Sequence, residues 1–124
     1  MKTKESIPLT GDQIVARYFR CLDNKDIDGM LDLFDYDAEL YEPFSNITGG
    51  LKGKSSIEPF FKVAMMANSN LIRTIKIEKT SKPNTIIALV IYEKGDKVKS
   101  RFTFQFEDNE NDRKKIKSLH IEFL

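Results

Sequence analysis

The chain has 124 residues, enough for one domain that buries roughly two-thirds of the surface of its unfolded chain. Its net charge of +1 gives no broad electrostatic attraction to nucleic acid or to an anionic membrane, and no apolar run has the length of a membrane span. The single cysteine, Cys21, excludes an intrachain disulfide and is compatible with a reducing compartment. Because no apolar run follows the charged N-terminus, we expect no secretory signal and a cytoplasmic protein.

The first part of the chain predicts two helices that lead into a strand. Thr10 and Gln13 have the spacing of a capping box, so the first helix should start there. Its apolar stripe consists of Ile14, Val15, Tyr18, Phe19 and Leu22. Asp26 is the expected cap of a second helix, whose core-facing residues are Ile27, Met30, Leu31 and Phe34. A strand should follow at residues 38–41 and end before Pro43, which has no N–H to donate to a neighbouring strand.

A third helix and four long strands are expected in the remainder. Residues 47–52 predict a short hairpin partner for the first strand. Ser55 and Glu58 form a second capping box, and the helix that they start should run to about residue 67 with Pro59 in its first turn. From there the pattern is that of β-strands, at residues 71–78, 85–93, 98–106 and 116–123.

This order predicts an α+β domain over residues 10–124, preceded by a loosely held tail at residues 1–9. Apolar and polar side chains alternate along the last two predicted strands, so the sheet should have one apolar face. Three helices are available to cover that face. A curved sheet wrapped around helices leaves a concave apolar pocket between the two layers.

A set of residues spread over the chain matches a known pattern. They are Ala16-Arg17-Tyr18, Asp26-Ile27, Leu33-Phe34, Asp37-Ala38, Glu42-Pro43-Phe44, Gly53 and Phe60-Phe61. This set resembles the nuclear-transport-factor-2-like superfamily and, within it, the ketosteroid isomerases and SnoaL-like polyketide cyclases. The resemblance implies a cystatin-like, cone-shaped barrel, in which a curved and mainly antiparallel sheet wraps around three helices. It implies no single activity, because this fold hosts enzymes, binding modules and interaction domains.

The resemblance also implies roles for individual residues. Tyr18 falls on the tyrosine that donates a hydrogen bond to the developing enolate oxygen, and Glu42 falls on the carboxylate that shuttles the proton. The second oxyanion donor of the isomerases would fall on Phe102, which cannot donate a hydrogen bond. Losing one such donor typically lowers the rate by a factor of about 10²–10³. Tyrosines that support the donor in some members fall on Phe34 and Phe61.

These matches predict a protein that binds a small hydrophobic carbonyl compound, with Glu42 and Tyr18 as catalytic residues of a cofactor-free isomerase or cyclase. The alternative is a non-catalytic ligand-binding or dimerisation module of the same fold, which Phe102 favours. The expected ligand-binding residues are Phe34, Phe44, Phe60, Phe61, Met65, Phe102, Phe104, Leu119, Ile121 and Phe123. A homodimer is expected through the outer face of the sheet, which carries Arg101, Thr103, Gln105, Ser118, His120 and Glu122.

Two rival motifs and the lone histidine do not predict a metal or nucleotide site. Residues 24–35 approach a calcium-binding loop, but Asn24 replaces its first aspartate and Asp35 replaces its bidentate glutamate. Residues 53–55 resemble a phosphate-binding loop, yet Thr48 stands where that motif needs glycine. His120 is the only histidine, so a zinc site would need other ligands nearby.

Overall fold

The computed structural model describes residues 9–43, 49–67, 72–94, 96–108 and 114–124. The helices are α1 (Gly11–Asn24), α2 (Ile27–Asp32) and α3 (Lys54–Ala67). The strands are β1 (Phe34–Tyr41), β2 (Leu51–Lys52), β3 (Ile72–Lys79), β4 (Thr85–Lys94), β5 (Asp96–Asp108) and β6 (Lys114–Phe123). This order confirms the predicted sequence of helix, helix, strand, strand, helix and four long strands.

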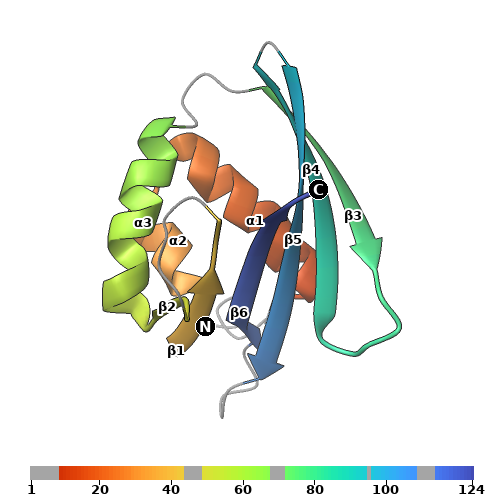
Figure 1. Ribbon diagram of the computed structural model, residues 1–124. Coiled ribbons are helices and arrows are strands. Elements are labelled where there is room, and N and C mark those ends of the chain that lie inside the picture. The colour runs from red at the N-terminus through yellow and green to blue at the C-terminus, as the bar shows by residue number, and fades with distance from the viewer. Residues whose placement is uncertain (1–8, 44–48, 68–71, 95, 109–113) are drawn as a thin grey trace, which may run out of the picture.

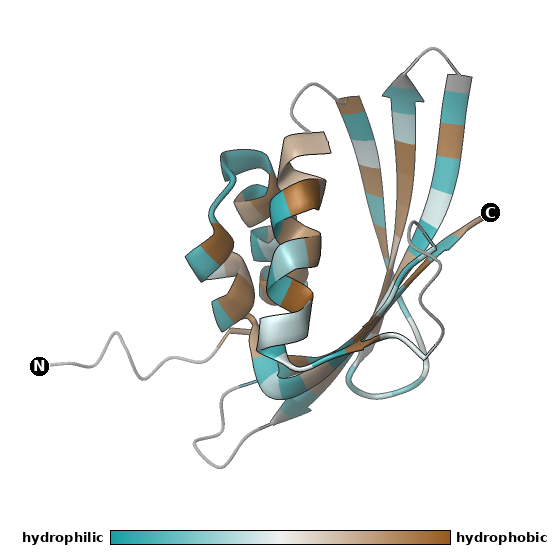
Figure 2. Cartoon of the chain, turned by 60° about the vertical axis from the view of Figure 1, so that its left-hand side comes forward, coloured by the Kyte–Doolittle hydropathy of each residue, from teal (hydrophilic) through white to brown (hydrophobic). Residues whose placement is uncertain are grey.

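The strands of the described residues form one sheet in the order β2-β1-β6-β5-β4-β3. Strands β3 to β6 pair with their chain neighbours in antiparallel fashion, whereas β1 pairs with β6 in parallel. The three helices lie on one side of this curved sheet (Figure 1). Hydrophilic and hydrophobic residues alternate along the strands, as Figure 2 shows for the part of the sheet that extends away from the helices. The predicted α+β class and the sheet wrapped on helices are therefore confirmed.

The first two helices begin where the sequence predicts. Thr10 Oγ1 accepts from the N–H of Gln13 at 3.2 Å, and Gln13 Oε1 accepts from the N–H of Thr10 at 2.9 Å. This reciprocal pair satisfies two of the donors that a helix start leaves without partners. At α2, Asp26 Oδ1 accepts from the N–H of Gly29 at 2.9 Å. Asp26, which falls within the calcium-like pattern, is thus the helix cap that the sequence predicts.

The start of α3 corrects the sequence prediction. The helix begins at Lys54, so Ser55 lies inside it and is not its cap. Gly53 precedes the helix with φ +85, and its carbonyl accepts from the N–H groups of Ser56 and Ile57, both at 3.1 Å. Glycine adopts such a positive φ without a steric penalty, which is why the helix starts here. Pro59 therefore lies in the interior of α3, beyond its first turn.

The start of β1 is the second correction. Phe34 was predicted on the second helix, but it opens β1 and pairs with Ile116 of β6. The N–H of Ile116 also donates to the carbonyl of Leu33 at 2.8 Å, so pairing with the last strand ends the helix early. Phe34 still points into the core, with 1% of its surface exposed. Residues 47 and 48 of the predicted hairpin partner lie outside the described residues.

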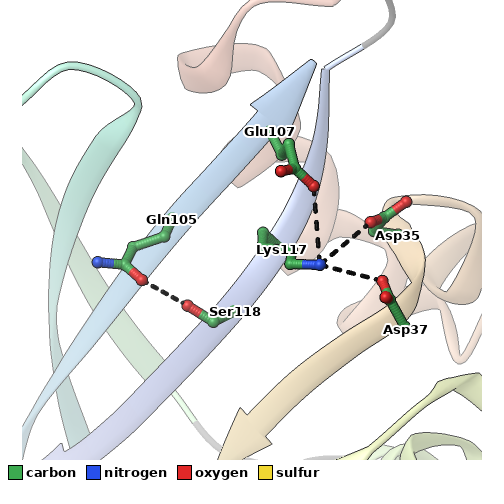
Figure 3. A network of polar contacts seen from close by, with 6 residues as sticks. All are labelled: Asp35, Asp37, Gln105, Glu107, Lys117 and Ser118. Carbon is green, nitrogen blue, oxygen red and sulfur yellow. Dashed lines mark hydrogen bonds and ion pairs between the residues drawn. The ribbon is translucent and has the colours of Figure 1, made fainter. Parts of the chain in front are cut away.

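Polar contacts on the outer face hold the junction of β1, β6 and β5. Lys117 Nζ lies 3.1 Å from Asp37 Oδ1 and 3.7 Å from carboxylate oxygens of both Asp35 and Glu107 (Figure 3). Beside it, the hydroxyl of Ser118 donates to Gln105 Oε1 at 2.7 Å. The register shifts in this region, between residues 105 and 106 of β5 and between residues 34 and 39 of β1. Lys117 therefore joins three strands where their pairing is irregular.

Candidate functional site

Tyr18 lies in the middle of the interior between the helices and the sheet, with 2% of its surface exposed. Its ring makes edge contacts with Phe19 of α1, Phe61 of α3, and Phe102 and Phe104 of β5, at centroid distances of 4.9, 5.8, 6.2 and 5.2 Å. Helical spacing on α1 and strand alternation on β5 direct these rings to one place. We call these four rings the aromatic shell of Tyr18.

The phenol of Tyr18 is a donor that stays protonated. Burial raises the pKa of Tyr18 far above its ordinary value, and Tyr92 raises it further, while Arg73 lowers it. Burial also raises the pKa of Tyr92, against opposing effects of Arg73 and of a hydrogen bond with Ser100. At neutral pH both phenols are therefore uncharged, and each can donate one hydrogen bond.

Arg73 is the functional candidate that the sequence reasoning missed. It lies on β3 opposite Tyr92, and only 5% of its side chain is exposed. Its Nη2 donates to Asp23 at the end of α1, and its guanidinium lies 5.6 Å from the centroid of the Phe19 ring. Among the described residues, Nε and Nη1 of Arg73 are buried without a hydrogen-bond partner. The signal in the sequence was one charged residue on a predicted strand face whose other residues are apolar, namely Leu71, Ile75 and Ile77.

Glu42 is half-buried and directly follows β1. The preceding Tyr41 faces outward, where its ring stacks on His120 at 4.4 Å, and Leu40 before it is fully buried. Strand alternation would therefore turn Glu42 toward the inner face. Its pairing with Tyr18 as a catalytic acid–base pair stays a prediction.

Most of the predicted ligand-binding residues are core residues. Those with at most 6% of their surface exposed are Phe34, Phe61, Met65, Phe102, Phe104, Leu119 and Ile121. Phe60 is partly buried, Phe123 is 51% exposed at the end of β6, and Phe44 lies outside the described residues. The phenylalanines contact one another, since the ring of Phe61 lies 5.5 Å from that of Phe34 and 5.2 Å from that of Phe60. The chain's own side chains thus occupy the centre of the interior.

Two clefts open elsewhere on the described surface. One of about 270 Å³ lies between α1 and α2 and is lined by Arg17, Cys21 and Asp26, among others. Burial and the nearby Asp26 raise the pKa of the Cys21 thiol, which disfavours a reactive thiolate there. The other cleft, of about 220 Å³, lies at the start of α1 between Asp12 and Lys79. Neither cleft is lined by Tyr18 or Glu42.

The outer face of the sheet is polar toward β6 and more apolar toward β4. On the polar side, Arg101 Nη1 donates to Glu122 Oε1 at 2.6 Å, and His120 is exposed. On the other side, β4 presents half-buried isoleucine and leucine side chains at Ile87, Leu89 and Ile91. The homodimer expected through this face stays a prediction.

No metal-binding cluster of three or more histidine, cysteine or acidic side chains occurs among the described residues. Within the same part of the chain, none of the helices is long and apolar enough to cross a membrane.

The sequence matches neither a protein-family model nor a curated protein. The fold, by contrast, matches solved structures over nearly the whole chain. A SnoaL-like protein of unknown function from Burkholderia thailandensis superposes with a TM-score of 0.71 at 16% identity, covering 95% of this chain and 99% of the other. An NTF2-like protein of unknown function from Cytophaga hutchinsonii gives a TM-score of 0.66 at 13% identity, covering 100% and 95%.

The chain has the NTF2-like fold. A protein of unknown function with a cystatin-like fold, from Methylobium petroleophilum, agrees, with a TM-score of 0.70 at 14% identity over 90% of this chain and 74% of the other. The resemblance that the sequence predicts is therefore confirmed at the level of the fold. At such identities an NTF2-like fold carries no activity with it.

Proposed function

We propose that this chain binds a small hydrophobic carbonyl compound between its helices and the inner face of its sheet. The phenol of Tyr18 donates a hydrogen bond to the carbonyl oxygen of that ligand. The observation that carries the proposal is a protonated phenol inside an aromatic shell. A buried tyrosine hydroxyl usually has a polar partner, and an apolar ligand with one carbonyl group supplies both the partner and the packing.

Binding requires side chains to move, because the aromatic shell and its neighbours fill the interior. Met65 lies one helical turn after Phe61 on α3 and is also buried. Methionine is unbranched and adapts its shape at low cost, so this part of α3 is suited to admit a ligand. Phe123 lies exposed at the end of β6, across from Ser100 on β5, and provides apolar surface there.

As an enzyme, this site would transfer a proton at the carbon next to the carbonyl group. The carboxylate of Glu42 takes the proton, the C–H electron pair forms a carbon–carbon double bond, the π pair of the carbonyl group moves to its oxygen, and Tyr18 donates to the resulting enolate. If the ligand carries a β,γ carbon–carbon double bond, the enolate is conjugated with it, and return of the proton from Glu42 to the γ-carbon completes an isomerisation without a cofactor. The strand register supports this role, because Tyr41 pairs with His120, and the next residue of β6, Ile121, pairs with Phe102 of the aromatic shell.

The second candidate is a binding module without turnover. Phe102 favours it, because its ring lies 6.2 Å from that of Tyr18 and brings an apolar face where the isomerases carry a second donor. With one donor instead of two, the enolate is stabilised less, by a factor of about 10²–10³ in rate.

The test is the binding of 2-acetylnaphthalene, a neutral aromatic ketone, to the wild type and to Tyr18→Phe. Loss of one neutral hydrogen bond should weaken binding about 2- to 10-fold. Tyr41→Phe is the matched control, because its hydroxyl donates to Glu39 Oε1 at 2.7 Å on the outer face. Equal affinities for the wild type and Tyr18→Phe would refute the assignment of Tyr18 as the carbonyl donor.

A further inference from the structure

We infer that Arg73 binds the carboxylate of the ligand, so that the chain takes a hydrophobic carboxylic acid. This inference rests on the proposed function, because it names the chemical class of the molecule bound in the same interior. It concerns a residue that the sequence pattern does not assign to a site.

The first argument is the incomplete hydrogen bonding of Arg73. Its guanidinium is almost fully buried, yet Nε and Nη1 have no partner among the described residues. Together these two nitrogens carry three N–H donors. Buried donors on a charged group are nearly always paired in native proteins, so an exception needs an explanation such as a missing ligand.

The second argument is the surplus of donors around Arg73. Two protonated phenols, Tyr18 and Tyr92, interact electrostatically with the guanidinium. The hydroxyl of Ser100, which also contacts Tyr92, donates to the carbonyl of Val90 at 3.3 Å. A carboxylate offers two oxygens with about four acceptor positions, which fits a site where donors outnumber acceptors.

The third argument is the position of Asp23, the carboxylate that Arg73 contacts among the described residues. Asp23 lies at the end of α1 and its side chain is 59% exposed, so it engages the guanidinium from the solvent side. The guanidinium also lies 5.6 Å from the centroid of the Phe19 ring, and that ring belongs to the aromatic shell, 4.9 Å from the ring of Tyr18. A ligand with its apolar part in the aromatic shell therefore has its acidic group within reach of Arg73. In Figure 1, β3 begins at the top of the view, the side at which α1 and α3 also end.

The competing explanation is purely structural. In that case the contact of Arg73 with Asp23 only fastens β3 to α1, and the remaining N–H groups bind water. The two explanations differ in one measurable quantity, the preference of the interior for a carboxylate over a neutral group of the same shape.

The experiment compares 2-naphthoate with 2-acetylnaphthalene at neutral pH by calorimetric titration of the full chain. The probes share one ring system and differ in the acidic group. We expect the wild type to bind naphthoate at least about 10-fold tighter than the ketone, as charge-assisted hydrogen bonds predict. Arg73→Met should abolish this preference, whereas Arg101→Met, which removes an arginine paired with Glu122 on the outer face, should preserve it.

Each outcome tests the role of Arg73 separately from the proposed function. Ketone binding without a naphthoate preference, or with a preference that survives in Arg73→Met, overturns the role of Arg73 and leaves the proposed function intact. Naphthoate binding that depends on Arg73, without ketone binding, supports the role of Arg73 and overturns the neutral carbonyl ligand. Failure of both probes to bind at millimolar concentration overturns both claims.

A second measurement needs no variant. The Nε–H resonance of Arg73 in the wild type should shift on addition of naphthoate but not on addition of the ketone. An Nε–H resonance that responds equally to both probes would overturn the inference even if Arg73→Met failed to fold.

Discussion

Arg73 and Asp23 lie 50 positions apart in the chain, and their side chains join the start of β3 to the end of α1. The contact is asymmetric, because 5% of the arginine side chain is exposed against 59% of the aspartate. Asp23 therefore accepts a hydrogen bond from Nη2 of Arg73 on the solvent side. Nε and Nη1 of the same guanidinium stay buried without a partner among the described residues. This arrangement should lower the stability of the unliganded protein, because a buried donor without a partner has lost its water without gaining a hydrogen bond.

The first prediction concerns stability in the absence of ligand. Asp23→Asn should lower the free energy of unfolding by about 1 kcal/mol, because a buried guanidinium loses its charged partner but the lost contact is largely solvated. Arg73→Met should change it little or raise it by up to about 3 kcal/mol, because an apolar side chain replaces a poorly satisfied buried charge. Urea unfolding measures both. A loss in Arg73→Met as large as in Asp23→Asn would show that Arg73 is mainly a structural clamp.

The second prediction compares Thr10, which caps a helix, with Ser55, which has the sequence pattern of a cap but lies inside α3. Thr10→Ala should cost about 1 kcal/mol, because it removes the acceptor for the N–H of Gln13 at the start of α1. Ser55→Ala should not lower the free energy of unfolding. Ser55 lies within α3, its side chain is exposed to solvent, and alanine favours helices. Chemical denaturation of the two variants makes the comparison. A destabilising Ser55→Ala would mean that α3 begins at Ser55 after all.

These two helix starts show what the sequence can and cannot predict. The capping box at Thr10 is a local pattern, and so is the cap at Asp26, so both were predictable. The start of α3 depends on the positive φ of Gly53, and the end of α2 depends on pairing with β6, which is remote in the chain.

The residues of the candidate site also fall into those that the sequence could predict and those that it could not. Helical and strand periodicity sufficed to place Tyr18 and the phenylalanines in the interior. Arg73 could not be predicted as a candidate, because its burial and its missing partners arise only when β3, β4 and α1 come together.

The third prediction is the pH dependence of the contacts made by Lys117. A hydrogen bond from Lys117 lowers the pKa of Asp37, and the same bond raises the pKa of Lys117. The stabilisation by Asp37 is thus complete above the ordinary aspartate pKa of about 4 and is lost as the pH falls through its lowered value. The stabilisation by Lys117 is complete below the ordinary lysine pKa of about 10.4 and is lost as the pH rises through its raised value.

Lys117→Met should therefore lower Tm at neutral pH, where Asp35, Asp37 and Glu107 are left to repel one another, and have a smaller effect in acid. Lys62→Met is the control, because Lys62 contacts only the partly exposed Glu58 among the described ion pairs, at 3.0 Å. Thermal unfolding at several pH values tests this. An equal drop in Tm at acid and neutral pH would mean that Lys117 acts through packing alone.

The fourth prediction separates an enzyme from a binding module. If Glu42 abstracts a proton next to the ligand carbonyl, the chain should catalyse exchange of the methyl protons of 2-acetylnaphthalene for deuterium in D₂O. Glu42→Gln should abolish the catalysed exchange and keep the affinity for the ketone, because the amide is nearly isosteric but is not a base at neutral pH. Proton NMR of the methyl signal follows the reaction. If the methyl protons exchange no faster with the wild type than without protein, Glu42 is not the catalytic base, and the second candidate function, a binding module, stands.

The central claim is that the ligand binds against Tyr18, and aromatic-region NMR tests it most directly. The protein is labelled on its phenylalanine and tyrosine rings and titrated with 2-acetylnaphthalene. The account predicts shifts that are largest for Tyr18, Phe61, Phe102 and Phe104. Shifts confined to Tyr41 on the outer face or to Phe106 beside the cleft at the start of α1, with Tyr18 unmoved, would contradict it.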